Sequence, residues 1–369
     1  MKQRILFMMI DMNIGGTEKA FLNMVSEMDM TKYDVTLLLL EEKGGFLKDV
    51  PKDVQVEVLE NYQQIKNEIM EPPLKCVKKA VRLKKYLEAI GILFYHFMFK
   101  ISNDRTSYYR FVLRRAKKRT NYDVAVAFAG PMEFITTYIL EKVEAKKKVQ
   151  WVHFDISKNG TNINHAKHNY LRFDKIFVVS DEAKKILIEA IPGIKSITET
   201  KHNVVSEKMC LQQSKIGETY DEYEGIKILT VGRLYKEKGQ DIIPDVAKQL
   251  KQEGYNFKWY LIGEGSLRKE IEEKINKYDL KNDVILLGTK TNPYGYYKDA
   301  TIYVQTSRHE GFGITIAEAK IFKLPIVSTD VAGAREQLKD KNEMIVKFDI
   351  EDLTKGIEKL LKIADGESR

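Results

Sequence analysis

The sequence predicts an α/β protein made of two domains, each with a parallel β-sheet covered by helices. The chain has 369 residues, more than the roughly 250–300 residues at which one hydrophobic core stops growing. Short apolar runs alternate with amphipathic helical stretches, which is typical of parallel βαβ units. This alternation lapses between residues 201 and 225. We therefore expect a first domain of residues 1–205 and a second of residues 206–369, whose last helix is a candidate to pack back on the first.

The predicted strands are continuous apolar runs, as expected for strands buried on both faces. In the first domain they cover residues 5–10, 34–40, 54–59, 123–128, 149–152 and 175–179, with a helix over 17–28. In the second domain they cover residues 226–231, 258–262, 284–287, 302–306, 325–328 and 343–346, with helices over 240–252, 266–278, 313–322 and 350–363. Both halves repeat a plan of strand, glycine-containing turn and helix, which indicates two Rossmann-like domains facing a central cleft.

A basic, aromatic-rich segment over residues 71–119 interrupts the first domain and predicts a helical insertion. The net charge of the chain is +8, but the stretch from Lys75 to Arg119 alone carries +12, so the rest carries −4. Such a stretch is typical of a solvated helix face or of a surface that attracts polyanions, for example an anionic membrane. Because no RNA- or DNA-binding motif accompanies it, we do not expect nucleic acid as a partner.

Composition excludes several classes of protein. The two cysteines, Cys76 and Cys210, cannot form a disulfide framework or a cysteine-rich zinc site. The apolar run at residues 5–10 is too short for most signal peptides and ends at Asp11. No run of about 18 uncharged apolar residues exists to span a bilayer. We expect a cytoplasmic protein, at most peripheral to the inner face of a membrane.

The first motif, Ile10–Glu18, follows the first strand and opens the first helix. Ligands of open α/β sheets bind at the carboxyl ends of strands. Gly15 and Gly16 would let the backbone approach a ligand closely, and the N–H groups at a helix start favour an anion. The motif is not G-x-G-x-x-G, so it does not indicate a dinucleotide. A plain glycine-rich turn explains it equally well.

The second motif, Val231–Gly239, follows the first strand of the second domain. It places Arg233 and Lys238 in one loop before a helix. Two cations there would clamp a diphosphate, Arg233 with its planar fork and Lys238 as a point charge. Two ordinary surface cations are the alternative.

The third motif, His309–Glu318, follows a predicted strand and enters a helix. Glu310 lies in the loop and Glu318 lies about one turn inside the helix. An acid in such a turn can also serve only as a cap that stabilises the helix dipole. The residues between them would present backbone N–H groups to a ligand: Gly311, Phe312, Gly313 and Ile314.

A fourth motif is Trp151–Asp155, at the end of a first-domain strand. It contains His153, which lies at the carboxyl edge where ligand-contacting residues gather. A single histidine near a strand end is more often structural.

The second and third motifs, together with Leu261–Gly265 and Val327–Gly333, resemble the retaining glycosyltransferases of family 4, the group 1 glycosyl transferases, which have the GT-B architecture. Glu310 and Glu318 match the two family glutamates separated by seven residues, and Gly15–Glu18 resembles the N-terminal glycine loop. The resemblance covers most of residues 225–340. In the first domain it is limited to the ends of a few strands.

The resemblance implies a nucleoside-diphosphate-sugar donor and no cofactor or divalent metal. The same resemblance implies that Arg233 and Lys238 neutralise the donor diphosphate and that Glu318 holds the ribose hydroxyls. Glu310, a catalytic candidate, contacts the donor sugar, with the amides of Gly311–Ile314 beside it.

The resemblance also assigns two residues of the first domain. Gly16 would line the phosphate side of the donor, and His153, the second catalytic candidate, would lie near the sugar. The chain departs from the family pattern in two places. His202–Val205 replaces a usual Pro-x-Gly-Val-Asp turn, and Lys323 replaces a small residue after the helix that carries Glu318.

The expected activity is retaining, metal-independent transfer of a sugar, with a UDP-sugar as donor. The expected acceptor is a hydroxyl of a lipid-linked or cell-envelope saccharide. The alternatives are a GT-B nucleotide-sugar epimerase and a non-catalytic nucleotide-sugar-binding protein. The intact glutamate pair and the two cations favour transfer.

Overall fold

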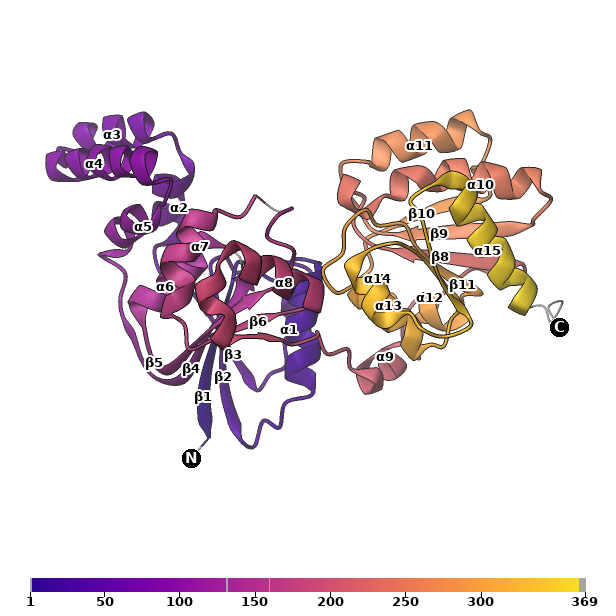
Figure 1. Cartoon of the computed structure of the whole chain (residues 1–369), viewed down its shortest axis with the longest axis horizontal. Helices are drawn as coiled ribbons and strands as arrows, with labels where there is room; N and C mark the ends of the chain where they lie inside the picture. Colours follow the sequence, from indigo (N-terminus) through magenta and orange to yellow (C-terminus); the bar gives the residue numbers. More distant parts are fainter. Residues whose placement is uncertain (1, 131, 159, 365–369) are drawn as a thin grey trace. The chain divides into compact units, whose positions relative to one another are not determined.

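A computed structural model describes residues 2–130, 132–158 and 160–364, and it divides the chain into two compact units (Figure 1). The first unit comprises Met1–Asn13 and Met28–His202, and the second comprises Ile14–Glu27 and Asn203–Arg369. The segment Ile14–Glu27 therefore groups with the second unit, whereas the sequence placed it in the first domain.

The first unit contains a seven-stranded parallel sheet in the order β3-β2-β1-β4-β5-β6-β7. Its strands are β1 (Gln3–Met9), β2 (Tyr33–Leu39), β3 (Val54–Val58), β4 (Arg119–Gly130), β5 (Val143–Val152), β6 (Lys175–Val178) and β7 (Thr198–Thr200). Its helices are α2 (Tyr62–Met70), α3 (Pro73–Arg82), α4 (Tyr86–Ser102), α5 (Thr106–Leu113), α6 (Glu133–Lys142), α7 (Ile163–Asn169) and α8 (Asp181–Ala190). Short 3₁₀ helices lie at η1 (Leu47–Asp49), η2 (Tyr170–Arg172) and η3 (Pro192–Ile197).

The second unit contains a six-stranded parallel sheet in the order β10-β9-β8-β11-β12-β13. Its strands are β8 (Ile226–Val231), β9 (Phe257–Ile262), β10 (Val284–Gly288), β11 (Ile302–Gln305), β12 (Ile326–Thr329) and β13 (Glu343–Val346). Its helices are α1 (Gly16–Ser26), α9 (Glu207–Gln213), α10 (Ile243–Gln252), α11 (Arg268–Lys277), α12 (Tyr294–Asp299), α13 (Ile314–Ile321), α14 (Ala332–Gln337) and α15 (Ile350–Ala364), with 3₁₀ turns η4 (Lys236–Lys238) and η5 (Gln240–Ile242).

The chain of the second unit reverses its winding direction between β8 and β11, and in open α/β sheets ligands bind at the carboxyl ends of the strands at such a point. Two clusters of buried side chains cover the two faces of this sheet. One cluster joins the strands to α10, α11 and α15, and the other joins them to α9, α12, α13 and α14. The two Rossmann-like parallel-sheet domains predicted from the sequence are thus confirmed.

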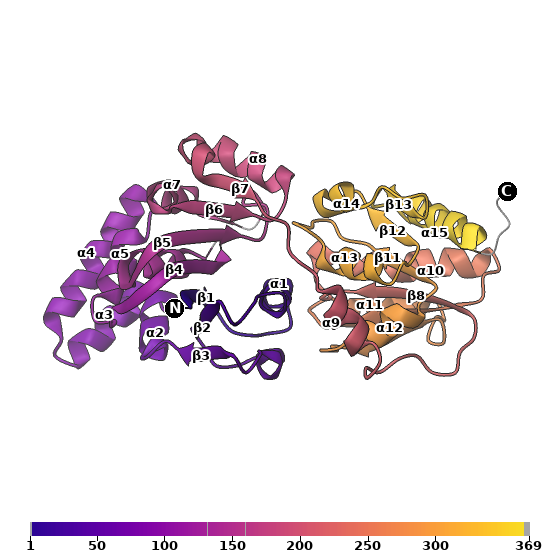
Figure 2. The same ribbon diagram turned by 90° about the horizontal axis from the view of Figure 1, so that it is seen from below.

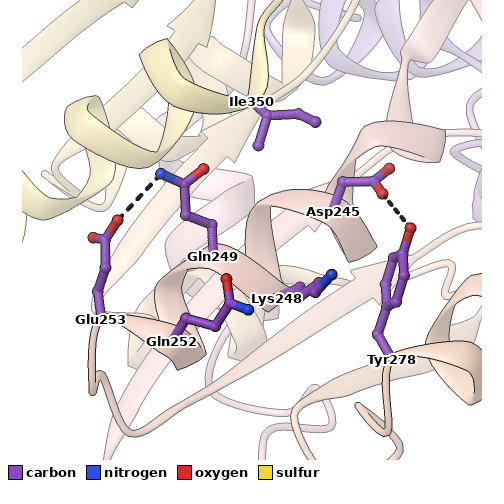
Figure 3. Close-up of a pocket in the computed structure, with 7 residues that line it drawn as sticks. All are labelled: Asp245, Lys248, Gln249, Gln252, Glu253, Tyr278 and Ile350. Atoms are coloured by element: carbon purple, nitrogen blue, oxygen red, sulfur yellow. Dashed lines mark hydrogen bonds between the residues drawn. The ribbon is translucent and has the colours of Figure 1, made fainter.

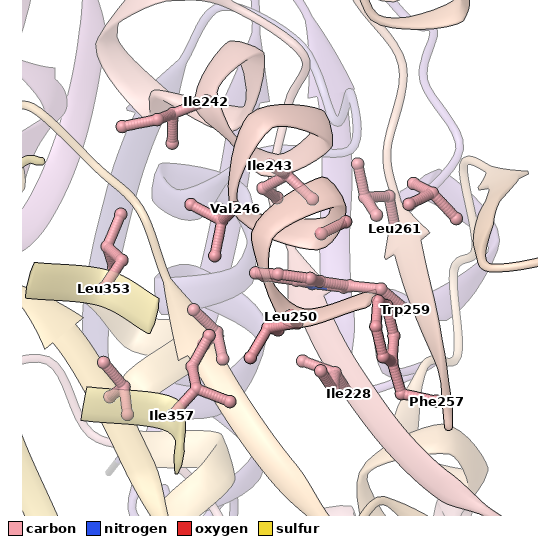
Figure 4. Close-up of a cluster of buried hydrophobic side chains, with 14 of the residues drawn as sticks. Ile228, Ile242, Ile243, Val246, Leu250, Phe257, Trp259, Leu261, Leu353 and Ile357 are labelled. Atoms are coloured by element: carbon pink, nitrogen blue, oxygen red, sulfur yellow. The ribbon is translucent and has the colours of Figure 1, made fainter. Parts of the chain in front are cut away.

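Trp259 on β9 lies at the centre of the first of these clusters (Figure 4). Its indole is fully buried, and its Nε1 donates a hydrogen bond to Thr230 Oγ1 at 3.0 Å. Leu353 and Ile357 of α15 pack into the same cluster. The last helix therefore completes the core of the second unit, while its packing back on the first domain stays a prediction.

The insertion of the first unit folds as the helices α3, α4 and α5. The helices α3 and α4 pack side by side at the edge of the unit (Figures 1 and 2). Gly91 lets α4 approach α5 closely, because a Cβ there would lie 2.4 Å from Cζ of Phe111. Tyr95 packs on the same Phe111 ring at 4.9 Å between centroids.

The structure explains why a small residue suits position 323. Lys323 follows the C-cap of α13 with φ of +57°. Its N–H donates to the Lys320 carbonyl, and the N–H of Leu324 donates to the Ala319 carbonyl. This is the left-handed helix end that glycine occupies without a steric cost, whereas an L side chain is strained there.

We predict that Lys323→Gly raises the free energy of unfolding by about 1 kcal/mol, because it removes this strain. The matched control is Lys248→Gly, at an exposed position inside α10, which should lower stability by about 1 kcal/mol. Urea unfolding of both variants measures the two changes. A loss of stability in Lys323→Gly would contradict the strain at this position.

Candidate active site

The loops that follow β8 and β9 touch at the carboxyl edge of the second sheet. Gly263 has φ of +149°, and a Cβ on it would lie 1.9 Å from the Gly232 carbonyl oxygen. The N–H of Leu234 donates to the Glu264 carbonyl at 2.9 Å. Glycine is thus required where the backbones approach, and the loop of the second motif is held at the edge of the sheet.

Lys238 and Glu310 form an ion pair across this edge. The ammonium of Lys238 lies 2.5 Å from Oε1 of Glu310, and the two side chains are only 22% and 10% exposed. The same oxygen accepts hydrogen bonds from Gln305 Nε2 at 2.8 Å and from Ser307 Oγ at 2.9 Å. Within the described parts of the chain, Oε2 of Glu310 has no recorded hydrogen-bond partner. The carboxylate is therefore fixed through one oxygen and has the other available for a ligand.

Backbone contacts lock together the two loops that carry this pair. Gly239 has φ of +65°, and a Cβ there would lie 2.0 Å from the Thr306 carbonyl oxygen. The hydroxyl of Thr306 donates to the Lys238 carbonyl at 3.1 Å. Arg308 makes a bidentate pair with Asp241 at 2.6 and 2.7 Å. The position of Lys238 relative to Glu310 thus depends on more than the ion pair itself.

The turn after Glu310 ends in the N-terminus of α13. Gly313 is the N-cap residue with φ of +80°, and a Cβ on Gly333 would lie 2.2 Å from the Phe312 carbonyl oxygen. Gln337 Nε2 also donates to the carbonyl of Phe312. The first N–H groups of a helix have no acceptor within the helix and carry its positive dipole end. The turn therefore places an anion-binding helix start next to the ion pair.

Glu318 lies about one turn after the start of α13 and is buried, with 3% of its surface exposed. Its carboxylate accepts hydrogen bonds from Tyr294 at 2.9 Å and from Tyr297 at 3.2 Å. The Nζ atom of Lys19, on α1, lies 4.0 Å from Oε1 of Glu318 and 4.5 Å from the centroid of the Tyr294 ring. Burial raises the pKa of Glu318, and the charge of Lys19 opposes that shift.

Arg233 does not share a partner with Lys238. Its guanidinium pairs with Glu237 of the same loop at 3.2 Å and lies 5.2 Å from the centroid of the Tyr235 ring. More than half of its side chain is exposed. The structure therefore places one of the two predicted cations in the ion pair and leaves the other at the surface of the loop.

Gly16 is the first residue of α1 and belongs to the second unit. A Cβ on Gly16 would meet no described heavy atom within 4 Å, whereas a Cβ on Gly15 would lie 2.5 Å from Oε2 of Glu18. Packing inside the described chain does not require glycine at position 16. Open space therefore adjoins the N-terminus of this helix.

His153 lies in the first unit, after β5, and is buried among aromatic rings. Its ring lies 4.7 Å from Phe128 and stacks on Trp151 at 6.0 Å between centroids. Burial lowers its pKa to about 3, against a smaller opposing effect of the Phe128 backbone. Burial therefore favours the uncharged form of this ring.

The structure adds side chains that the motifs did not predict. Gln305 and Ser307 orient Glu310, while Tyr294, Tyr297 and Lys19 surround Glu318. Gln305 and Ser307 lie just before the third motif in the sequence, so they could have been predicted as neighbours of Glu310. Lys19 and the tyrosines come from distant segments, and nothing in the sequence pairs them with Glu318.

A cavity of about 420 Å³ elsewhere in the second unit contains none of the predicted residues (Figure 3). It lies beside α10, and Asp245 in its wall accepts a hydrogen bond from Tyr278 at 2.8 Å. Gln249 donates to Glu253 at 3.1 Å. These polar groups already have partners, so the carboxyl edge remains the better candidate for chemistry.

Comparison with known proteins finds similarity to glycosyltransferases. Residues 216–369 match the family described as Glycosyl transferases group 1. An uncharacterized glycosyltransferase of Methanocaldococcus jannaschii is 34% identical over 178 residues, which is 47% of this chain. The matched stretch spans only 44% of that relative.

Two longer matches cover almost the whole chain. The Campylobacter jejuni N-acetylgalactosamine-N,N'-diacetylbacillosaminyl-diphospho-undecaprenol 4-alpha-N-acetylgalactosaminyltransferase is 24% identical, covering 98% of this chain and 90% of the relative. The crystal structure of Anabaena HepE in complex with UDP and glucose has a TM-score of 0.70 at 18% identity, covering 99% of this chain and 91% of HepE. This likeness confirms the GT-B fold.

We predict that Glu318→Gln makes the stability of the protein less dependent on pH. The folded-state pKa of Glu318 is raised, so its contribution to stability is present at acidic pH and is lost as the pH rises through that pKa. Each unit of pKa shift corresponds to about 1.4 kcal/mol. Urea unfolding of both proteins from about pH 5 to about pH 8 measures the difference.

The wild type should lose more stability than Glu318→Gln over this range. Glu207→Gln, which alters an exposed carboxylate at the start of α9, serves as the control and should follow the wild type. Parallel profiles for wild type and Glu318→Gln would show that burial does not perturb this carboxylate.

Proposed function

We propose that this protein is a retaining, metal-independent glycosyltransferase that takes a sugar from a nucleoside-diphosphate sugar, with UDP as the nucleotide. The observation that carries the proposal is the pairing of Lys238 with Glu310 beside the N-terminus of α13. This arrangement joins a cation, a helix dipole and a carboxylate with one available oxygen. A sugar bound through a diphosphate needs groups of these three kinds.

The leaving diphosphate is the group that Lys238 and α13 would stabilise. Breaking the bond to the anomeric carbon develops positive charge on the sugar and negative charge on the diphosphate. Fixed cations and helix N–H groups interact more strongly where charge develops, so they lower the barrier. Lys238 would turn from Glu310 to the diphosphate. Arg233 would also bind the diphosphate, since its side chain is exposed and pairs with Glu237 of the same loop.

Glu310 keeps its position when Lys238 turns away, because Gln305 and Ser307 still bind its Oε1. Its Oε2 would then accept a hydrogen bond from a hydroxyl of the donor sugar. Glu318 would accept the ribose hydroxyls, since a carboxylate has lone pairs beyond those used by Tyr294 and Tyr297. Gly16 would adjoin the phosphates, and His153 would contact the sugar as a neutral imidazole.

The relatives support the choice of substrates. HepE was crystallised with UDP and glucose, and the name of the C. jejuni relative specifies an acceptor saccharide on diphospho-undecaprenol. We accordingly propose a hydroxyl of a lipid-linked or cell-envelope saccharide as the acceptor. We place the reaction in the cytoplasm, at the inner face of the membrane where such an acceptor is presented.

We predict that Glu310→Ala and Lys238→Ala each lower kcat by about 10²–10³-fold, as expected when one transition-state contact is lost. The assay measures UDP released from UDP-sugars in the presence of lipid-linked saccharides. Lys248→Ala and Glu253→Ala remove the same charges from the wall of the cavity beside α10 and should retain wild-type turnover. Wild-type turnover in Glu310→Ala and Lys238→Ala, with native melting curves, would contradict the roles assigned to Glu310 and Lys238.

We also predict that UDP raises the Tm of the protein, because a ligand that binds only the folded state stabilises it. At a concentration about 100 times Kd the gain is about 2.7 kcal/mol. Thermal unfolding with UDP, GDP, ADP and inorganic pyrophosphate compares the nucleotides. Lys238→Ala should lose most of the shift, and a Tm unchanged by all four compounds would count against a diphosphate site.

A further inference from the structure

The helix α4 presents a continuous apolar face outside the core of the first unit. Leu87, Ile90, Phe94, Phe97 and Ile101 follow one another at intervals of three and four residues, so they lie on one side of the helix. All five are exposed, from 55% for Phe94 to 86% for Leu87. Further exposed apolar side chains of α4 are Tyr86, Leu93 and Met98.

The opposite side of α4 is already used for packing. Ala89 and Ile92 are buried, and Gly91 approaches Phe111 of α5. Glu88 is buried as well and pairs with Arg115 at 2.7 Å. The insertion thus folds with its outer apolar face uncovered, in the part of the chain that the structure describes.

This exposure is concentrated in one place. Of the 22 large hydrophobic side chains that are exposed among the described residues, 11 lie between Leu74 and Ile101. Single exposed apolar residues are normal on a soluble protein, but a contiguous apolar patch marks an interaction site.

Basic side chains of α3 and α4 are exposed as well. Lys78, Lys79 and Arg82 of α3 and Lys100 of α4 are exposed. None of these four forms an ion pair within the described residues. We call the exposed apolar side chains from Leu74 to Ile101, together with these four cations, the α3–α4 surface.

Acidic groups do not offset this charge. The stretch from Lys75 to Arg119 contains only two acidic residues, Glu88 and Asp104. Glu88 is turned inward onto Arg115, and Asp104 accepts hydrogen bonds from the N–H and the hydroxyl of Thr106. The α3–α4 surface is therefore both apolar and positively charged.

We propose that the α3–α4 surface binds an anionic lipid bilayer, with α4 lying in the interface. The exposed leucine, isoleucine and phenylalanine side chains would enter the boundary between headgroups and acyl chains, while the lysines and arginine contact anionic headgroups. No described helix is long and apolar enough to cross a bilayer, so the contact is peripheral.

The charge favours lipid over the other possible occupants. A second copy of the chain would bring two strongly basic segments together, and their repulsion opposes a dimer through this face. Nucleic acid would neutralise the cations but would leave the large apolar face in water. An anionic bilayer satisfies both parts of the surface at once.

Vesicle co-sedimentation of the full chain tests this proposal without reference to catalysis. Wild type should sediment with vesicles of an equimolar mixture of phosphatidylcholine and phosphatidylglycerol but not with phosphatidylcholine alone. The variant Lys78→Gln/Lys79→Gln/Arg82→Gln/Lys100→Gln should bind roughly 600-fold more weakly, at about fivefold for each of the four charges removed. Leu87→Gln/Phe97→Gln should bind at least about tenfold more weakly.

The matched controls change equivalent residues elsewhere. The control for the charge variant is Lys215→Gln/Lys281→Gln/Lys298→Gln/Lys341→Gln, at four exposed lysines. The control for the apolar variant is Leu171→Gln/Ile216→Gln, at two exposed apolar residues. Both controls and Glu310→Ala should bind like wild type, so a failed catalytic assignment would leave this result intact. Because the residues changed in the two test variants and the two controls are exposed, melting curves of these four variants should stay native.

Four outcomes would overturn the proposal. The first is equal binding to neutral and anionic vesicles, and the second is unchanged binding in both test variants. The third is a dimer in sedimentation velocity that Leu87→Gln/Phe97→Gln dissociates, which would assign the face to a second copy. RNA that binds to the surface without requiring Leu87 and Phe97 would also contradict a lipid site.

Discussion

The ion pair of Lys238 and Glu310 is the interaction on which the rest of the site depends. It joins two loops that leave the sheet at its switch point, and glycine at position 239 is required because the Thr306 carbonyl occupies the space of a side chain. Gln305 and Ser307 hold Glu310 independently of the lysine. In the proposed function, Lys238 would turn to the diphosphate while these two contacts keep Glu310 in place.

Glu318 shows how a site can depend on a distant part of the chain. Its neighbour Lys19 lies on α1, which begins at the glycine loop after β1 and groups with the second unit. The same helix contacts the segment that enters the second unit, since Glu27 accepts a hydrogen bond from the Ser206 hydroxyl. The helix that begins at the glycine loop thus also supplies the lysine beside the buried glutamate.

The sequence was sufficient for the sheets and for the two acidic motifs but not for the partners of those motifs. Buried parallel strands read as continuous apolar runs, so β8 and β13 were predicted to the residue and most other strands to within a few residues. The short strand β7 was not predicted. Glu310 and Glu318 were placed on the correct loop and helix because their spacing is local. The grouping of Lys19 with Glu318 and the pairing of Arg233 with Glu237 depend on side-chain geometry, which no periodicity records.

The most direct test of the central claim is a crystal structure of the protein with UDP. The account predicts that the diphosphate oxygens lie within hydrogen-bonding distance of Lys238 Nζ and of the first backbone N–H groups of α13, with Glu310 still bound to Gln305 and Ser307. A diphosphate bound away from the carboxyl edge of β8 and β11, with the pair of Lys238 and Glu310 unbroken, would contradict it.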